Sequence, residues 1–218
     1  MTATKFQKII ALWLLAGAAA FALAWPLDDA TGRALIVDAK VNPGLHHFAA
    51  ICSKLAEGWV IAVVGIFGAA IFFFLKRPEL AAKIFFIALT SSVAGLVATI
   101  FRICIGRTRP NNHSVAQGIY GLWHDGHWTI GQAAFSSLPS GHAASAVGVA
   151  AAAWLVSRSW GAAFAVYALA VMWSRIALEC HHLSDVTASM FLAIVVALLM
   201  RKYFAAANER IFHRLAGR

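Results

Sequence analysis

The stretch LAAKIFFIALTSSVAGLVATIF, Leu80–Phe101, contains 22 residues, and Lys83 is its only charged residue. A helix needs about 20 mainly apolar residues to cross the hydrocarbon core of a bilayer. The run also contains Gly, Ala and Ser, the small residues that let helices pack closely in lipid. This stretch therefore predicts a transmembrane helix and, with it, a membrane protein.

Five other stretches are similarly apolar and nearly as long, and no run alternates apolar and polar residues as a membrane β-strand does. We expect an all-α, polytopic membrane protein: a six-transmembrane-helix bundle formed by residues 1–218 as a single integral membrane domain. The five further spans are Ile9–Trp25, Trp59–Leu75, Pro139–Val156, Gly161–Leu178 and His182–Met200.

The overall composition agrees with this class. Hydrophobic residues make up 61% of the 218 and charged residues 12%, whereas globular proteins have about 45–50% and about 25%. Disorder and an ordinary soluble fold both fit this composition poorly. The net charge of +9 is compatible with nucleic-acid binding, but the cations cluster at the ends of apolar runs, so we expect no nucleic-acid partner.

These cations also predict the orientation. Cytoplasmic loops of membrane proteins are enriched in Lys and Arg, and with simple alternation the basic helix ends fall on one side. Both termini are therefore expected to be cytoplasmic, with 203–218 as a cytoplasmic tail and 26–58 as an outer interfacial segment. A cleaved signal peptide at the N-terminus is the alternative. The basic helix ends are marked by Lys5, Lys8, Lys76, Arg77, Arg158, Arg201 and Lys202.

Ionisable residues at membrane depth are costly and mark functional sites. Three such groups occur at the outer ends of helices: Arg102–Pro110, Leu138–His142 and Ser174–Asp185. Alternating helices place all three on the same side of the membrane. We expect them to converge on one site.

The residue types in these groups favour phosphoryl transfer. The planar guanidinium groups of Arg102, Arg109 and Arg175 suit phosphate oxygens, and Pro139–Gly141 opens a helix whose N–H groups attract anions. His181 and Asp185 are four residues apart, so a helix places them on one face. Asp185 is then able to accept a hydrogen bond from the imidazole and set its tautomer.

The three groups resemble the motifs of the type 2 phosphatidic acid phosphatase superfamily: Lys-x6-Arg-Pro, Pro-Ser-Gly-His and Ser-Arg-x5-His-x3-Asp. The resemblance extends from Arg102 to Asp185, residues 102–185, and favours the bacterial membrane lipid phosphatase branch. It implies a lipid phosphatase that works through a phosphohistidine and uses no metal or other cofactor. The implied catalytic residues are His181 (nucleophile), His142 (acid, then base) and Asp185 (orienting partner), and the implied phosphate-binding residues are Arg102, Arg109, Ser140, Gly141 and Arg175.

The match to the motifs is not straightforward at three places in the sequence. Arg102 stands where the motif has lysine, which keeps the charge but changes the geometry. Of the doublet His181-His182, only His181 satisfies both spacings of the third motif. Arg107 lies inside the first motif without matching one of its positions, and either a phosphate contact or an interfacial anchor fits it.

Other polar residues have weaker interpretations. The His124–His127 stretch fits no familiar zinc spacing, and residues 111–137 are expected to form a loop over the site. Cys52, Cys104 and Cys180 are expected to be free thiols.

We expect an integral protein of the bacterial inner membrane whose site faces the periplasm and whose substrate is a lipid phosphomonoester or pyrophosphate. Undecaprenyl pyrophosphate, phosphatidylglycerol phosphate, phosphatidic acid and the phosphates of lipid A all remain candidates. A lipid phosphotransferase that uses the same phosphohistidine is an alternative, as is a non-catalytic lipid-binding membrane protein. A vanadium-dependent haloperoxidase shares the motifs, but six apolar spans argue against it. The sequence does not predict an oligomeric state.

Overall fold

The computed structural model describes residues 3–216, with side chains for residues 4–204. The chain is mostly helical, so the predicted all-α class is confirmed. Its helices are α1 (Ala3–Ala24), η1 (Trp25–Leu27), α2 (Asp28–Leu35), α3 (Pro43–Leu55), α4 (Gly58–Phe74), α5 (Pro78–Ile105), η2 (Ala133–Phe135), α6 (Gly141–Val156), α7 (Arg158–Ala177) and α8 (Leu183–Ala216), and a small antiparallel hairpin joins β1 (Trp123–His124) to β2 (His127–Trp128).

Four helical stretches within the described residues are long and apolar enough to cross a membrane: Thr4–Leu35, α5, α7 and Leu183–Phe204. The pair α3 and α4 passes the same test as one span bent by 59°. The helix α6 is apolar but has only 16 residues. The chain is thus an integral membrane protein with four candidate spans among the described residues, or five if the bent pair is one span, and the predicted span Pro139–Val156 falls on α6, which is too short to pass the test.

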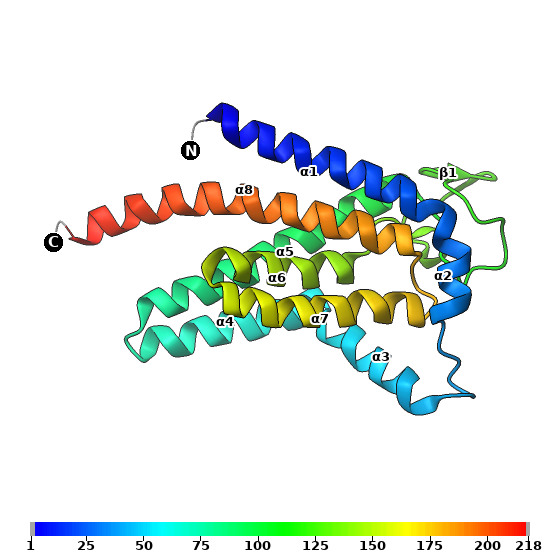
Figure 1. Ribbon diagram of the computed structural model, residues 1–218, viewed down its shortest axis with the longest axis horizontal. Helices are drawn as coiled ribbons and strands as arrows, with labels where there is room; N and C mark the ends of the chain where they lie inside the picture. Colours follow the sequence, from blue (N-terminus) through cyan, green and yellow to red (C-terminus); the bar gives the residue numbers. More distant parts are fainter. Residues whose placement is uncertain (1–2, 217–218) are drawn as a thin grey trace.

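The long helices run roughly along one axis, whereas α2 lies across it and α3 is inclined to it (Figure 1). The helix α6 lies at the centre and packs against α5, α7 and α8, while α1 covers α8 and α4 covers α5. The beginning of α1, the end of α8, and the α4–α5 and α6–α7 turns lie toward one end of the bundle. The opposite end carries α2, the β1–β2 hairpin and the α7–α8 turn.

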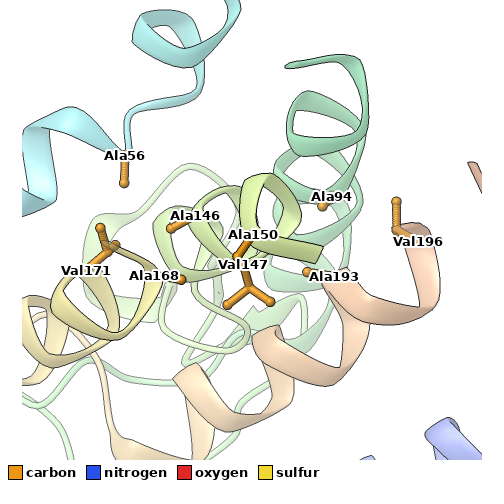
Figure 2. Packing of buried hydrophobic residues seen from close by; sticks show 9 residues of the cluster. All are labelled: Ala56, Ala94, Ala146, Val147, Ala150, Ala168, Val171, Ala193 and Val196. Carbon is orange, nitrogen blue, oxygen red and sulfur yellow. The ribbon is translucent and has the colours of Figure 1, made fainter. Parts of the chain in front are cut away.

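The middle of the bundle is packed with small side chains. Gly148 of α6 has no room for a side chain, because a Cβ there would lie 2.9 Å from the Cα of Ser91 and 3.2 Å from the Cβ of Ala94 on α5. Lipid tails are as apolar as a protein core, so van der Waals contact between closely approaching helices has to hold them together. Figure 2 shows the buried cluster formed by Ala56, Ala94, Ala146, Val147, Ala150, Ala168, Val171, Ala193 and Val196.

The predicted interfacial segment 26–58 folds into short helices against the bundle. After α2, the N–H of Val37 donates to the carbonyl of Ala177 at the end of α7 (3.0 Å), and α3 also packs against α7. The predicted tail 203–218 falls on the last turns of α8 up to Ala216, and residues 217–218 lie outside the described part of the chain.

Candidate active site

The first motif leaves the membrane helix through a turn that requires glycine. α5 ends at Ile105, and Gly106 adopts a left-handed conformation (φ 62°), in which its N–H donates to the carbonyl of Arg102 (3.3 Å). A Cβ on Gly106 would also collide with the carbonyl of Gly121. Two further backbone hydrogen bonds hold the chain beyond the turn. The N–H of Thr108 donates to the carbonyl of Gly118 (3.0 Å), and the N–H of Arg109 donates to the carbonyl of Ala134 (2.9 Å).

Arg107 is not an interfacial anchor, because it is only 4% exposed, whereas a phosphate contact of its guanidinium group stays a prediction. Its side chain is buried, with Nη2 2.7 Å from Oδ2 of Asp28 and Nη1 2.5 Å from Oδ1 of Asp185. The guanidinium carbon lies 4.0 Å from the ring centre of Trp25. Two carboxylates therefore compensate the charge of Arg107 inside the protein.

The second motif begins α6. Ser140 is the buried N-cap residue, and its hydroxyl accepts a hydrogen bond from the N–H of Ala143 (3.4 Å). Gly141 lies beside the first motif, because a Cβ there would be 3.6 Å from Nη1 of Arg102. The N–H groups of a first helical turn have no partner within the helix and carry partial positive charge. Arg102 and the start of α6 thus form one electropositive surface.

The third motif places His181 in the α7–α8 turn, where the residue is 1% exposed. Its Nδ1 lies 2.7 Å from the carbonyl oxygen of Ser137. A carbonyl can only accept, so in the neutral ring Nδ1 carries the proton and Nε2 keeps its lone pair. This tautomer leaves Nε2 free to attack an electrophile.

Asp185 is positioned differently from the sequence-based expectation. Its Oδ2 is 3.6 Å from Nδ1 of His181, which is too long for a hydrogen bond. Oδ2 instead accepts from the hydroxyl of Ser137 (2.5 Å) and the N–H of His182 (2.9 Å), while Oδ1 accepts from Arg107. Asp185 therefore acts on the imidazole through its charge and through Ser137, whose carbonyl makes the direct contact.

Arg175 comes from the last turn of α7 and is also buried. Its Nη1 donates to the hydroxyl of Ser53 on α3. Among the described residues, Nε of Arg175 and Nε2 of His181 are buried without a hydrogen-bond partner. Such atoms are uncommon in folded proteins and call for an explanation.

The charged groups of the three motifs lie within electrostatic reach of one another. His142 interacts with Arg102, Arg109, Arg175 and His181, and Arg102 interacts with both other arginines. Within residues 4–204, no carboxylate forms an ion pair with any of these three arginines. The structure therefore concentrates uncompensated positive charge beside two imidazoles.

Burial lowers the pKa of His181 to about 4, although the nearby carboxylate of Asp185 favours its protonation. The positive charges of Arg175 and Arg109 contribute in the same direction as burial. The imidazole is therefore neutral at pH 7, as a nitrogen nucleophile must be.

The site residues line different hollows. Arg102, Gly141 and His142 line a cavity of about 370 Å³ between α4, α5 and α6. An apolar cavity of about 670 Å³ lies next to it between α4, α5, α6 and α7, and its lining includes Ala88 and Val149, one helical turn from Ser92 and Ser145 of the polar cavity. His181 instead lines a smaller hollow of about 170 Å³.

Sequence reasoning missed Asp28, Ser53 and Ser137. Ser137 directly precedes the second motif, but a backbone carbonyl has no signal in a sequence. Asp28 had a signal in the sequence: it is an acidic residue three positions after the end of the predicted span Ile9–Trp25, where unpaired charge is costly. The 111–137 segment contains the β1–β2 hairpin and η2. No group of three possible metal ligands occurs in the described residues, and all three cysteines are free.

Comparison with known proteins places these features in context. A family model described as the PAP2 superfamily matches residues 81–209. The fold is similar to a transmembrane PAP2-type phosphatidylglycerolphosphate phosphatase from Bacillus subtilis, with 21% identity, a TM-score of 0.61 and coverage of 89% of this chain and 93% of that one. LpxE from Aquifex aeolicus matches at 21% identity and a TM-score of 0.48, over 76% of this chain and 92% of its own. None of the curated proteins compared with the chain matches it.

Proposed function

Because the chain belongs to the PAP2 superfamily, we propose that it is a lipid phosphatase that hydrolyses a membrane lipid phosphomonoester or pyrophosphate through a phosphohistidine, without a metal. The observation that carries this proposal is the buried Nε2 of His181. It has a free lone pair, no hydrogen-bond partner among the described residues, and Arg109 and Arg175 within electrostatic reach. A nucleophile beside uncompensated cations matches the needs of phosphoryl transfer.

In the first step, Nε2 of His181 attacks phosphorus while the bond to the lipid oxygen breaks. His142 donates a proton to that departing oxygen. Arg102, Arg109 and Arg175 bind the phosphoryl oxygens together with the hydroxyl of Ser140 and the N–H of Gly141. Preorganised donors of this kind stabilise the charge of the transition state more than that of the substrate.

In the second step, His142 takes a proton from water, and the water oxygen attacks phosphorus. The phosphorus–nitrogen bond breaks, which releases inorganic phosphate and returns His181 to its neutral form. The imidazole is positively charged while it carries the phosphoryl group, and the nearby carboxylate of Asp185 stabilises that charge.

The cavities support a lipid substrate. The polar cavity at Arg102 and His142 adjoins the apolar cavity between α4 and α7. A phosphate group in the first cavity would leave its hydrocarbon tail beside the second, and the tail would enter laterally from the bilayer. Because His181 lines a different hollow, the proposed attack also requires the first cavity to open toward Nε2 of His181.

We also propose a six-crossing topology with both termini in the cytoplasm and the site facing the periplasm of a bacterial inner membrane. Support comes from the beginning of α1 and the end of α8, which lie at one end of the bundle while the α7–α8 turn lies at the other (Figure 1). The turn that contains Lys76 and Arg77, between α4 and α5, lies toward the same end as these two helix ends.

The test is phosphate release by the purified protein in lipid nanodiscs. Substrates are undecaprenyl pyrophosphate, phosphatidylglycerol phosphate, phosphatidic acid and lipid A, each with excess EDTA. We expect wild-type turnover on at least one lipid to survive the chelator, and we expect His181→Ala to lose about 10⁴-fold or more in kcat. His113→Ala, at an exposed residue of the 111–137 segment, is the matched control and should retain wild-type kcat.

Each part of the proposal has its own contradicting result. Loss of activity with EDTA would reject the metal-free mechanism, and activity in His181→Ala would reject the nucleophile. Transfer of labelled phosphate to a second lipid without release of inorganic phosphate would identify a phosphotransferase.

A further inference from the structure

Asp28 lies outside the residues that match the family, 81–209, yet its carboxylate is buried among the catalytic motifs. It is the first residue of α2, which packs against both α7 and α8 at the site end of the bundle. The residue is 7% exposed. A buried carboxylate is costly unless charged and polar groups compensate it, so its partners identify what it does.

One partner is Arg107, which Asp28 shares with Asp185. Oδ2 of Asp28 is 2.7 Å from Nη2 of Arg107, and Oδ1 of Asp185 is 2.5 Å from Nη1. The three side chains together carry one negative charge. If Arg107 faced Asp185 alone, the pair would be neutral, and less negative charge would act on His181. Because Asp28 also pairs with Arg107, that arginine does not fully cancel the negative charge of Asp185, and this charge acts on the imidazole of His181.

The other partner is Ser184 in the first turn of α8. Its N–H donates to Oδ1 of Asp28 (2.8 Å), and its hydroxyl donates to Oδ2 (2.6 Å) while accepting from Nη1 of Arg107 (2.7 Å). Asp28 thereby binds a free N–H at the helix start as a capping residue does, but from a distant part of the chain. Ser184 precedes Asp185 directly, so this contact fixes the carboxylate that holds Ser137.

We propose that Asp28 is a positioning residue for catalysis: by binding Arg107 and Ser184 it fixes Asp185 and Ser137, and these two fix the tautomer and the electrostatic environment of His181. The inference rests on the proposed phosphatase function for its kinetic consequence. Its structural consequence, a single tautomer of His181, does not depend on which reaction the protein catalyses.

The test variant is Asp28→Asn, which keeps the size of the side chain and removes its charge. An amide directs N–H groups toward Arg107 or Ser184, so at least one contact is lost. Displacements of about 1 Å in a catalytic group cost on the order of 10²-fold in rate, and we expect kcat to fall 10- to 100-fold. KM and inhibition by orthovanadate, a phosphate mimic, should change less than about threefold, because no proposed phosphate-binding residue is altered. Asp29→Asn is the control, with the same change on the exposed neighbouring residue, and should retain wild-type kcat.

The second measurement is independent of activity. In protein labelled with ¹⁵N-histidine, His181→Ala identifies the signals of His181. Wild type should show one neutral tautomer with the proton on Nδ1, and Asp28→Asn should show both. Ser184→Ala removes the hydroxyl that contacts Asp28 and Arg107 but leaves no charge unpaired. This variant therefore covers the case in which Asp28→Asn does not fold. It should lower kcat about threefold and mix the tautomers less.

The outcomes separate the two proposals. If wild type releases no phosphate from any lipid, the proposed function fails, while the tautomer comparison still decides the role of Asp28. A single unchanged tautomer in Asp28→Asn, or in Ser184→Ala where the first variant does not fold, would overturn the inference. So would wild-type kcat in Asp28→Asn, or a parallel loss of kcat and vanadate binding.

Discussion

At the end of the bundle that carries α2, the buried residues include charged and polar side chains such as Asp28, Arg107 and Asp185, whereas in the middle they are mainly alanine and valine. The charged residues contact each other across three separate segments of the chain at distances of 2.5 to 2.7 Å. The residues in the middle contact each other through small side chains on neighbouring helices (Figure 2).

The difference separates two kinds of stability. Hydrogen bonds and ion pairs are directional, and leaving one partner buried and alone costs several kcal/mol. Close packing of small side chains is less directional, and its loss is spread over many weak contacts. We therefore expect changes at the site end to affect catalysis first, and changes in the middle to affect stability without altering the chemistry.

Among changes to residues that position the nucleophile, the largest effect should come from Asp185→Asn, which disrupts the site end. Asp185 accepts hydrogen bonds from Arg107, Ser137 and His182, and an amide cannot accept all three or compensate the charge of Arg107. We expect kcat to fall about 10³-fold and the thermal unfolding midpoint to fall as well. Asp125→Asn, at a side chain 83% exposed, is the control that should change neither. A kcat above a tenth of the wild-type value would show that Asp185 is not needed to position His181.

The next effect is the pH dependence of the free energy of unfolding, to which His181 at the site end contributes. Burial lowers the pKa of His181 to about 4 in the folded protein, while an unfolded histidine has a pKa of about 6.5. Between these values the unfolded state binds more protons, so the free energy of unfolding falls as the pH falls. The loss should be about 2 kcal/mol at pH 5 relative to pH 7.

Unfolding of wild type and His181→Ala in detergent, followed by tryptophan fluorescence at pH 7 and pH 5, measures this contribution. The other titrating groups are present in both proteins, so most of their contribution cancels. An equal loss of stability in both would mean that His181 is not held in the neutral form. Because the pKa of His181 lies below this range, protonation of His181 should not change kcat/KM between pH 5 and pH 7.

The smallest effect on catalysis should come from Gly148→Ala in the middle of the bundle. The added Cβ would lie 2.9 Å from the Cα of Ser91, so α5 and α6 must move apart at a cost of about 1–3 kcal/mol. The kcat of the folded fraction should stay within about twofold of wild type. Gly44→Ala, where no atom lies within 4 Å of the added Cβ, is the control and should keep wild-type stability. A large loss of kcat without loss of stability would remove the distinction between the two regions.

Much of the fold was predictable because a bilayer imposes a length on its helices. The run Leu80–Phe101 lies within α5, and Gly161–Leu178 coincides with α7 apart from its ends. The bend of 59° between α3 and α4 was not predictable, because it depends on how α3 packs against α7.

The candidate site was predictable to the extent that function requires residue types at defined spacings. The three motifs identified Arg102, Arg109, His142 and His181, and the structure brings their charges within mutual reach. The contact between Ser137 and His181 was missed, because it is made by a backbone carbonyl. The hydrogen bond expected between Asp185 and His181 is replaced by two contacts of Ser137: its backbone carbonyl accepts from His181, and its hydroxyl donates to Asp185.

The sequence by itself determined that the chain is helical, lies in a membrane and carries the three motifs, because hydropathy, helix length and residue spacing are properties of short segments. Only the tertiary structure decided which charges are compensated. Arg107 and Arg109 are two residues apart, yet Arg107 is bound by two carboxylates and Arg109 by a backbone carbonyl. Electrostatic interactions depend on distance in space, and the folded chain brings Asp28 to Arg107 across 79 positions of sequence.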